Sequence, residues 1–137
     1  MLADDALGAM REAPSLPLAP GYFAAFDAID SDPNNELVVG ELDGTAVAVL
    51  QLTFIPNISR RGSWHSQIEG VRVDSSLRSS GVGRSLIAWA IERARNRGCS
   101  LVQLTSDKSR SDAIRFYESL GFVASHEGMK LELSPSP

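Results

Sequence analysis

The chain has 137 residues, 43% of them hydrophobic, which is a length and composition typical of one compact domain. Its formal net charge of −4 excludes a dedicated nucleic-acid-binding protein, because phosphate contacts require a basic surface. Its one cysteine, Cys99, excludes an intrachain disulfide and a metal cluster built from several cysteines.

The N-terminal part predicts two short helices and no targeting segment. Residues 1–12 lack the cationic start and long apolar block of a signal peptide, and no apolar run approaches the roughly 18 residues of a membrane span. We therefore expect a cytoplasmic protein with no membrane partner. Three prolines in Pro14–Pro20 separate the first helical piece from a second over Gly21–Ile29, whose apolar residues have helical spacing.

Strand and helix signals alternate through the rest of the chain. Asp43-Gly44 is a dipeptide typical of a tight hairpin turn. In chain order, the predicted elements are strands over Glu36–Leu42, Ala46–Ile55 and Trp64–Val73, a helix over Val82–Arg97, a strand over Cys99–Thr105, a helix over Ser111–Leu120, and a hairpin of Phe122–His126 with Met129–Leu133. This order predicts an α/β (α+β) fold with a mixed, mostly antiparallel central sheet flanked by helices. We expect a single domain over residues 1–133 and a disordered tail over residues 134–137.

A glycine-rich turn lies between the third predicted strand and the helix that follows it. The first amide groups of a helix have no partners within the helix, and the helix dipole favours a negative charge there. Gly81 and Gly83 leave room for a ligand beside the backbone, and Arg78 and Arg84 add positive charge. The turn is therefore predicted to bind an anion. The alternative is a tight turn with a solvated Arg78.

Two common phosphate-binding motifs do not fit this turn. A Walker loop has a lysine before its Ser or Thr, where this chain has Arg84-Ser85. A dinucleotide fingerprint has a small residue at the position of Leu86 and an acidic residue about 20 residues beyond the turn, where Val102 and Gln103 lie.

The pattern that does fit has two parts in a fixed order. Arg-x-x-Gly-x-Gly (78–83) follows a strand ending in Val-Arg-Val-Asp, and Phe-Tyr-Glu-x-Leu-Gly-Phe (116–122) comes later. With both parts, the chain resembles the GNAT superfamily of acetyl-CoA-dependent N-acetyltransferases, over residues 36–133 in element order and most strongly over residues 68–122. The resemblance implies acetyl-CoA as cosubstrate, with its pyrophosphate held by main-chain amides. We expect no metal, because His65 and His126 are far apart in the sequence and no acid-rich cluster accompanies them. The implied cofactor-binding residues are Val71, Arg72, Val73, Arg78, Ser79, Ser80, Gly81, Val82, Gly83, Arg84 and Ser85.

The same resemblance implies two catalytic residues. Tyr117 would act as the general acid that protonates the leaving thiolate, since a phenol is protonated at neutral pH. Glu69 would act as the base for the substrate ammonium, directly or through water, or would position the amine electrostatically. A main-chain amide near Arg72 or Val73 would polarise the thioester carbonyl. The alternatives are a core aromatic beside Phe116 for Tyr117 and a plain edge charge for Glu69.

The chain departs from the family pattern at two places. Arg110 stands where many relatives carry an asparagine that contacts pantetheine, so it either reaches a CoA phosphate or is solvated. The chain also begins at residues that resemble the middle of the family's first helix, so the first strand is absent or an upstream start was missed. An absent strand would leave a sheet edge unpaired, which favours a homodimer.

The expected function is transfer of an acetyl group from acetyl-CoA to a primary amine of a small molecule, directly within a ternary complex. Glu69 suits a cationic amine, whereas Arg60 and Arg61 favour an acceptor that also carries a carboxylate or phosphate. His65 either lines the acceptor pocket or is an ordinary strand residue. The alternatives are a non-catalytic acyl-CoA-binding or sensor domain and an acetyltransferase of a protein amine. The sequence leaves the acceptor open.

Overall fold

The computed structural model describes residues 1–134 and divides the chain into two units, residues 1–103 and residues 104–137. In chain order, the elements are α1 (Ala6–Arg11), α2 (Pro20–Ser31), β1 (Asn35–Leu42), β2 (Thr45–Pro56), α3 (Ser59–Gly62), β3 (Trp64–Val73), the short 3₁₀ helix η1 (Ser75–Leu77), α4 (Val82–Asn96), β4 (Cys99–Leu104) and α5 (Ser111–Ser119). The predicted helices and strands up to residue 120 are confirmed to within two residues at each end. The single-domain organisation stays a prediction. Residues 135–137 of the predicted tail lie outside the described residues.

The β1–β2 hairpin forms where the sequence predicted it. Asp43 and Gly44 both have positive φ, 49° and 78°, as the turn that joins two antiparallel strands with matching twist requires. The two strands pair from Asn35 with Thr53 to Leu42 with Thr45. The turn residues therefore determine the register next to the turn, and a shift between Gly40 and Glu41 changes it by one residue farther along the strands.

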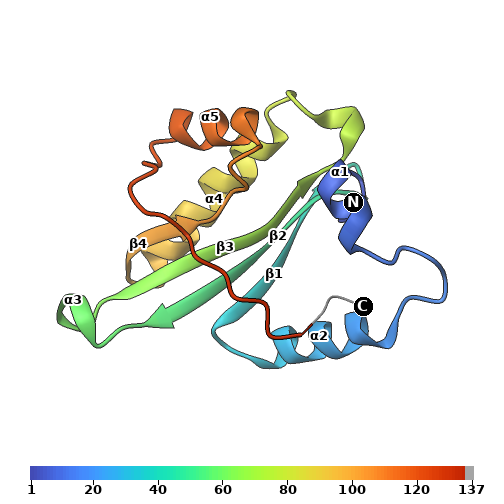
Figure 1. Cartoon of the computed structure of the whole chain (residues 1–137). Helices are drawn as coiled ribbons and strands as arrows, with labels where there is room; N and C mark the ends of the chain where they lie inside the picture. The colour runs from blue at the N-terminus through green and yellow to red at the C-terminus, as the bar shows by residue number, and fades with distance from the viewer. Residues whose placement is uncertain (135–137) are drawn as a thin grey trace. The chain divides into compact units, whose positions relative to one another are not determined.

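The four strands lie in the order β1-β2-β3-β4 (Figure 1). β2 and β3 pair in antiparallel fashion, and the register shifts where Gly70 adopts a φ of 61°. Such a shift is a β-bulge, which adds one residue to one strand and interrupts the ladder locally. Between β3 and β4 the chain passes through α4, the connection that parallel neighbours require, so the sheet is mixed.

The two faces of the sheet differ in character because side chains alternate along each strand. One face is apolar and packs against α4, which buries the core of the first unit. The buried residues are Ala48, Leu50, Leu52, Phe54 and Ile68 of the sheet and Leu86, Ile87, Ala90 and Ala94 of α4. The pairing of Gln51 with Glu69 and of Thr53 with Gln67 places these four polar side chains on the opposite face.

Two arginines tie the last turns of α4 to the sheet. Arg93 Nε donates to both carboxylate oxygens of Glu36 on β1, each at 3.0 Å, and this pairing raises the pKa of Arg93. The Arg97 guanidinium lies 4.1 Å from the centre of the Phe54 ring. These contacts add charged and cation–π interactions at the rim of the apolar core.

The predicted C-terminal hairpin is wrong for the described residues. No strand forms between Phe122 and Ser134, and Val123, Met129 and Leu131 are 79%, 95% and 84% exposed. A two-stranded hairpin gains little stability by itself, because it needs further strands or a helix to bury its apolar side chains. The two segments around Glu127-Gly128 indicated a hairpin, but they did not supply the surface that would cover its apolar side chains.

Two absences hold for the part of the chain that the structure describes. No strand precedes α1. Within residues 1–134, no helix combines the length and the apolar character that crossing a membrane would need.

Candidate functional site

The glycine-rich turn links β3 to α4 through η1 and residues 78–81. Ser79 and Gly81 have positive φ, 66° and 94°, so the chain reverses direction immediately before the helix begins. A Cβ built on Gly81 would meet no atom within 4 Å, so the backbone is open at this point. Because the first-turn amides of α4 have no carbonyl acceptor within the helix, the turn offers donors that suit a diphosphate.

Asp74 holds the start of this turn against the sheet. Its carboxylate accepts hydrogen bonds from the amide of Ser76 at 2.9 Å and from the Ser76 hydroxyl at 2.6 Å, and its own amide donates to Val47 at 2.7 Å. The side-chain bond from Ser76, followed by the backbone bond, lowers the pKa of Asp74. The carboxylate therefore stays ionised and keeps η1 in place at neutral pH.

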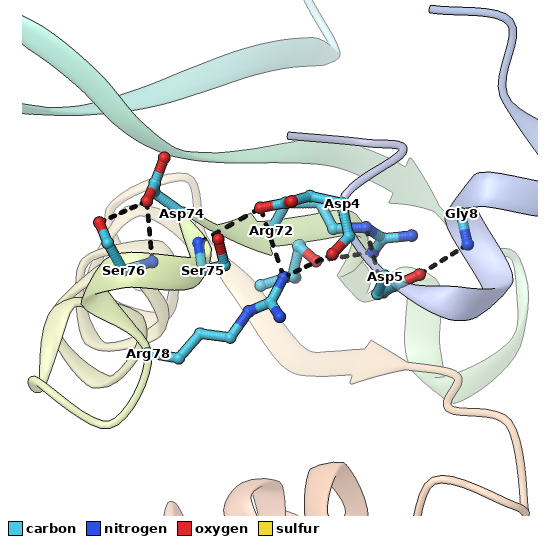
Figure 2. A network of polar contacts seen from close by, with 9 residues as sticks. Asp4, Asp5, Gly8, Arg72, Asp74, Ser75, Ser76 and Arg78 are labelled. Carbon is cyan, nitrogen blue, oxygen red and sulfur yellow. Dashed lines mark hydrogen bonds and ion pairs between the residues drawn. The ribbon is translucent and has the colours of Figure 1, made fainter.

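The N-terminal segment contacts the same turn (Figure 2). The Asp4 carboxylate accepts a hydrogen bond from the Ser75 amide at 3.2 Å, and Arg78 Nη2 donates to the Asp4 carbonyl at 3.1 Å. The Arg78 guanidinium also lies 3.6 Å from the Asp4 carboxylate. Arg78, expected to bind a CoA phosphate, thus has an acidic neighbour that the sequence analysis missed.

A second contact joins α1 to the strand before the turn. Asp5 caps α1 by accepting from the Gly8 amide at 2.6 Å, and its other carboxylate oxygen lies 3.6 Å from Arg72 Nε. The Arg72 side chain is only 11% exposed and donates to the Val71 carbonyl at 2.7 Å. Of these contacts, only the cap could have been expected from the sequence, since an aspartate immediately before a helix commonly caps it.

The bulge of β3 lies beside the residues expected to polarise the thioester. Arg72 pairs with Val49 and Val73 with Ala48, whereas the register breaks immediately before them, at Gly70 and Val71. A bulge leaves main-chain groups without ladder partners. The bulge therefore lies next to Arg72 and Val73, where the resemblance implies a main-chain amide that donates to the acetyl carbonyl.

Glu69 directly precedes this bulge and is exposed on the polar face of the sheet. Its neighbour on that face, Gln67, accepts a hydrogen bond from Gln103 of β4 at 2.7 Å. Gln51 and Thr53 donate to the Asn35 side chain at 3.1 Å and 2.9 Å. Glu69 thus lies among uncharged amide side chains, where a carboxylate can attract an ammonium group.

The remaining predicted site residues lie in the second unit. Tyr117, half-buried in α5, makes edge-to-face contacts with Phe116 and Phe122, whose ring centres lie 5.2 Å and 5.9 Å away. Arg110 is exposed at the N-cap position of α5. The first unit therefore contains Glu69 and residues 71–73 and 78–85, while Tyr117 and Arg110 belong to the second.

Comparison with known proteins gives a consistent assignment. The family model described as "Acetyltransferase (GNAT) family" matches residues 5–122. A glucosamine 6-phosphate N-acetyltransferase from Trypanosoma brucei brucei is 37% identical over 94 residues, which cover 69% of this chain and 59% of that protein. An aminoalkylphosphonate N-acetyltransferase from Salmonella typhimurium is 32% identical over 95 residues, covering 69% and 61%. The chain thus spans about three fifths of the length of these two relatives.

A solved structure resembles almost the whole chain. It is a crystal structure of a protein described as a transcriptional regulator from Bacillus halodurans C-125, and it is 53% identical to this chain. The match covers 97% of this chain and 89% of that protein, with a TM-score of 0.94.

Proposed function

Because this chain belongs to the acetyltransferase (GNAT) family, we propose that it transfers an acetyl group from acetyl-CoA to a primary amine of a small molecule, directly within a ternary complex. The observation that carries the proposal is the turn from β3 into α4, where an open Gly81 backbone precedes first-turn amides that suit a diphosphate. We expect the protein to act in the cytoplasm.

The proposed reaction requires three contributions from the protein. The amine nitrogen attacks the thioester carbonyl, so a C–N bond forms as the C–S bond breaks, and CoA leaves as a thiolate. Glu69 holds the ammonium group or accepts its proton, and Tyr117 donates a proton to the thiolate. The turn amides of residues 79–83, together with Arg78, hold the pyrophosphate, while a main-chain amide beside the Gly70 bulge polarises the carbonyl.

The relatives support a small-molecule acceptor. Their names specify glucosamine 6-phosphate and aminoalkylphosphonate, two acceptors that combine an amine with a phosphorus oxyanion. An exposed Glu69 on a polar sheet face is consistent with such an amine, because the carboxylate attracts the ammonium group without a bulky apolar pocket.

A non-catalytic acyl-CoA sensor is the second candidate. It is favoured by the description of the 53% identical Bacillus halodurans protein as a transcriptional regulator. The net charge of −4 gives no support to direct DNA binding. A sensor would bind acetyl-CoA, yet it would have no need of both Glu69 and Tyr117.

Calorimetry and thiol release together test the proposal. We expect titration with CoA and with acetyl-CoA to show binding, and we expect free thiol to accumulate when acetyl-CoA is mixed with one member of a panel of amines, peptides and amino sugars. The reaction without an amine is the control. Binding without thiol release from any acceptor would favour the sensor, and absence of CoA binding by folded protein would refute both functions.

The role of Tyr117 can be tested by a substitution that removes its hydroxyl group alone. Tyr117→Phe is expected to lower kcat by at least about 100-fold, a general-acid effect, while the affinity for acetyl-CoA changes by less than about twofold. Steady-state kinetics and calorimetry measure the two quantities. The matched control is Tyr22→Phe, which removes the other tyrosine hydroxyl, a donor to Glu12 at 2.7 Å, and should leave kcat unchanged. An equal fall in kcat and affinity would contradict the acid role.

A further inference from the structure

We infer that the acceptor carries a phosphate or phosphonate group, and that a pocket formed around Arg60 and His65 binds this group. The inference rests on the proposed acetyl transfer, because it assigns the chemistry of the acceptor in that reaction. The evidence comes from the pocket's lining, its charge, the conformation of its loop, and its position on the sheet face that bears Glu69.

The pocket lies where the loop between β2 and β3 meets the starts of β3 and β4. Its volume is about 180 Å³, which is room for several water molecules or one phosphate group. Its polar lining includes Asn57, Ser59, Arg60, Ser63, His65 and Ser100. Guanidinium, imidazole, amide and hydroxyl groups all donate hydrogen bonds, as recognition of phosphate oxygens requires.

The pocket is locally basic although the whole chain is acidic. The sequence contains no Asp or Glu between Asp43 and Glu69, and none in β4. Within residues 1–134, Arg60 and Arg61 form no ion pair, whereas Arg78 and Arg93 each face a carboxylate. An unpaired guanidinium beside a polar pocket is well suited to an oxyanion, which it can bind in a bidentate manner.

The loop holds Arg60 in an unusual backbone conformation. Arg60 and Arg61 both lie in the left-handed region, with φ of 52° and 60°. A residue with a side chain seldom adopts this region, because its Cβ comes too close to the backbone carbonyl oxygen. The loop is nevertheless tied down, since the Ser63 amide donates to the Arg60 carbonyl at 3.3 Å and the Asn57 amide donates to the Ser63 carbonyl at 3.2 Å.

His65 is fixed at the same place. Its Nδ1 forms a hydrogen bond with the Asn57 side-chain amide, and the ring lines the pocket. The His65 ring and the Arg60 main chain are therefore held by their surroundings, so only part of the pocket has to be ordered when a ligand binds. Such preorganisation reduces the ordering cost of binding.

The pocket lies on the same face of β3 as Glu69. Residues 65, 67 and 69 alternate onto one face, so the α carbons of His65 and Glu69 are about 13 Å apart along an extended strand. A glutamate carboxylate and an arginine guanidinium each lie several ångströms from their own α carbon, so the two charged groups can lie closer together than the α carbons do. An acceptor with its ammonium group at Glu69 and its oxyanion at Arg60 would pass over Gln67, whose amide can bind hydroxyl groups between them.

Two neighbouring arginines provide a matched pair of variants. Arg60→Asn and Arg61→Asn each remove one positive charge at a left-handed residue, a conformation that asparagine tolerates. Of these two arginines, Arg60 lines the pocket and Arg61 does not. We expect Arg60→Asn to raise KM for glucosamine 6-phosphate at least tenfold, with kcat and KM for glucosamine changed by less than twofold. Arg61→Asn should change each of these constants by less than twofold.

A binding measurement separates this inference from the proposed function. Inorganic phosphate is titrated into the ¹⁵N-labelled protein while the amide resonances of Asn57, His65 and Ser100 are followed by NMR. We expect these resonances to shift in the wild type and in Arg61→Asn, and at least tenfold more phosphate to be needed in Arg60→Asn. Glucosamine 6-phosphate and 2-aminoethylphosphonate, tested in parallel, distinguish a phosphate ester from a phosphonate.

The outcomes are distinct. Unshifted pocket resonances, equal weakening by the two arginine variants, or a lower KM for glucosamine than for its 6-phosphate would overturn the inference while leaving acetyl transfer intact. Phosphate binding at the pocket without acetylation of any amine would support the anion site and refute the proposed function instead.

Discussion

The residue at position 81 is restricted by its backbone conformation and not by its neighbours. Gly81 has a φ of 94°, while a Cβ there would meet no atom within 4 Å. Gly81→Ala is therefore expected to lower the free energy of unfolding by about 1–2 kcal/mol, and to weaken acetyl-CoA binding because the relaxed turn moves the amides of α4. Urea unfolding and calorimetry measure the two effects.

Gly21 in α2 provides the control for this change. A Cβ on Gly21 would also meet no atom within 4 Å, but the residue is helical, so alanine should leave stability unchanged or raise it by up to about 1 kcal/mol. Equal effects of the two substitutions would show that the turn imposes no left-handed requirement.

Individual site residues differ in how far the sequence predicts their surroundings. Gly81 was predicted at the open turn, because glycine at a helix start after a strand carries its own conformational signal. The partner of Arg78 was not predicted, since the Asp4 carbonyl that accepts its hydrogen bond is 74 residues away in the chain. Contacts over such separations depend on the folded chain path, which local patterns do not encode.

At the scale of the elements, β3 places a serine hydroxyl on its apolar, buried face. Ser66 is fully buried, and within residues 1–134 its hydroxyl has no hydrogen-bond partner. Ser66→Ala should leave the free energy of unfolding unchanged or raise it by up to about 1 kcal/mol, because it removes a desolvated hydroxyl. Denaturant unfolding provides the measurement.

The matched control is Thr53→Ala on β2. The Thr53 hydroxyl donates to Asn35 at 2.9 Å, so its loss should destabilise the protein by about 1 kcal/mol. If Ser66→Ala were as destabilising as Thr53→Ala, the Ser66 hydroxyl would have to be satisfied by a bound water molecule.

Elements were predicted well where local chemistry determines them. The β1–β2 turn followed from Asp43-Gly44, and the end of α4 from Gly98, which has a φ of 78°. The C-terminal hairpin was predicted from two short segments around Glu127-Gly128, and it failed because Met129 and Leu131 found no apolar surface in the described structure. The alternation of apolar and polar residues indicates which face of a strand is apolar, but it does not indicate which element packs against that face.

At the scale of the whole molecule, acid should destabilise the fold. Hydrogen bonds lower the pKa of Asp32, chiefly from the Asn34 amide, that of Asp74, chiefly from the Ser76 hydroxyl, and that of Asp107, chiefly from the Ser109 hydroxyl, all below the ordinary value of 3.8. A carboxyl with a lowered folded pKa contributes stability that is fully present above its unfolded pKa and is lost as pH falls through the folded pKa.

Urea unfolding from pH 7 to pH 2 tests this linkage. We expect the free energy of unfolding that these carboxyls contribute to be constant down to about pH 5 and to fall below about pH 4. Asp74→Asn should reduce the loss of stability on acidification, because it removes a carboxyl whose pKa is lowered in the folded state. A profile identical in wild type and Asp74→Asn would contradict the contribution of Asp74.

Two whole-molecule expectations stay predictions. The homodimer follows from an open sheet edge, and sedimentation at micromolar concentration measures it directly, with a monomeric mass as the contrary result. The cytoplasmic location is the second of these predictions.

The division of the sheet into two faces has a consequence for how new specificities arise. Leu52 and Phe54 support the fold on one face, while Gln51 and Gln67 project from the other without filling the core. Selection for a different acceptor can therefore act on the second face without eroding the first. A library randomised at Gln51 and Gln67 should yield mostly folded proteins. Acceptor specificity in this chain can therefore change through substitutions on this face that leave the stability of the fold largely unchanged.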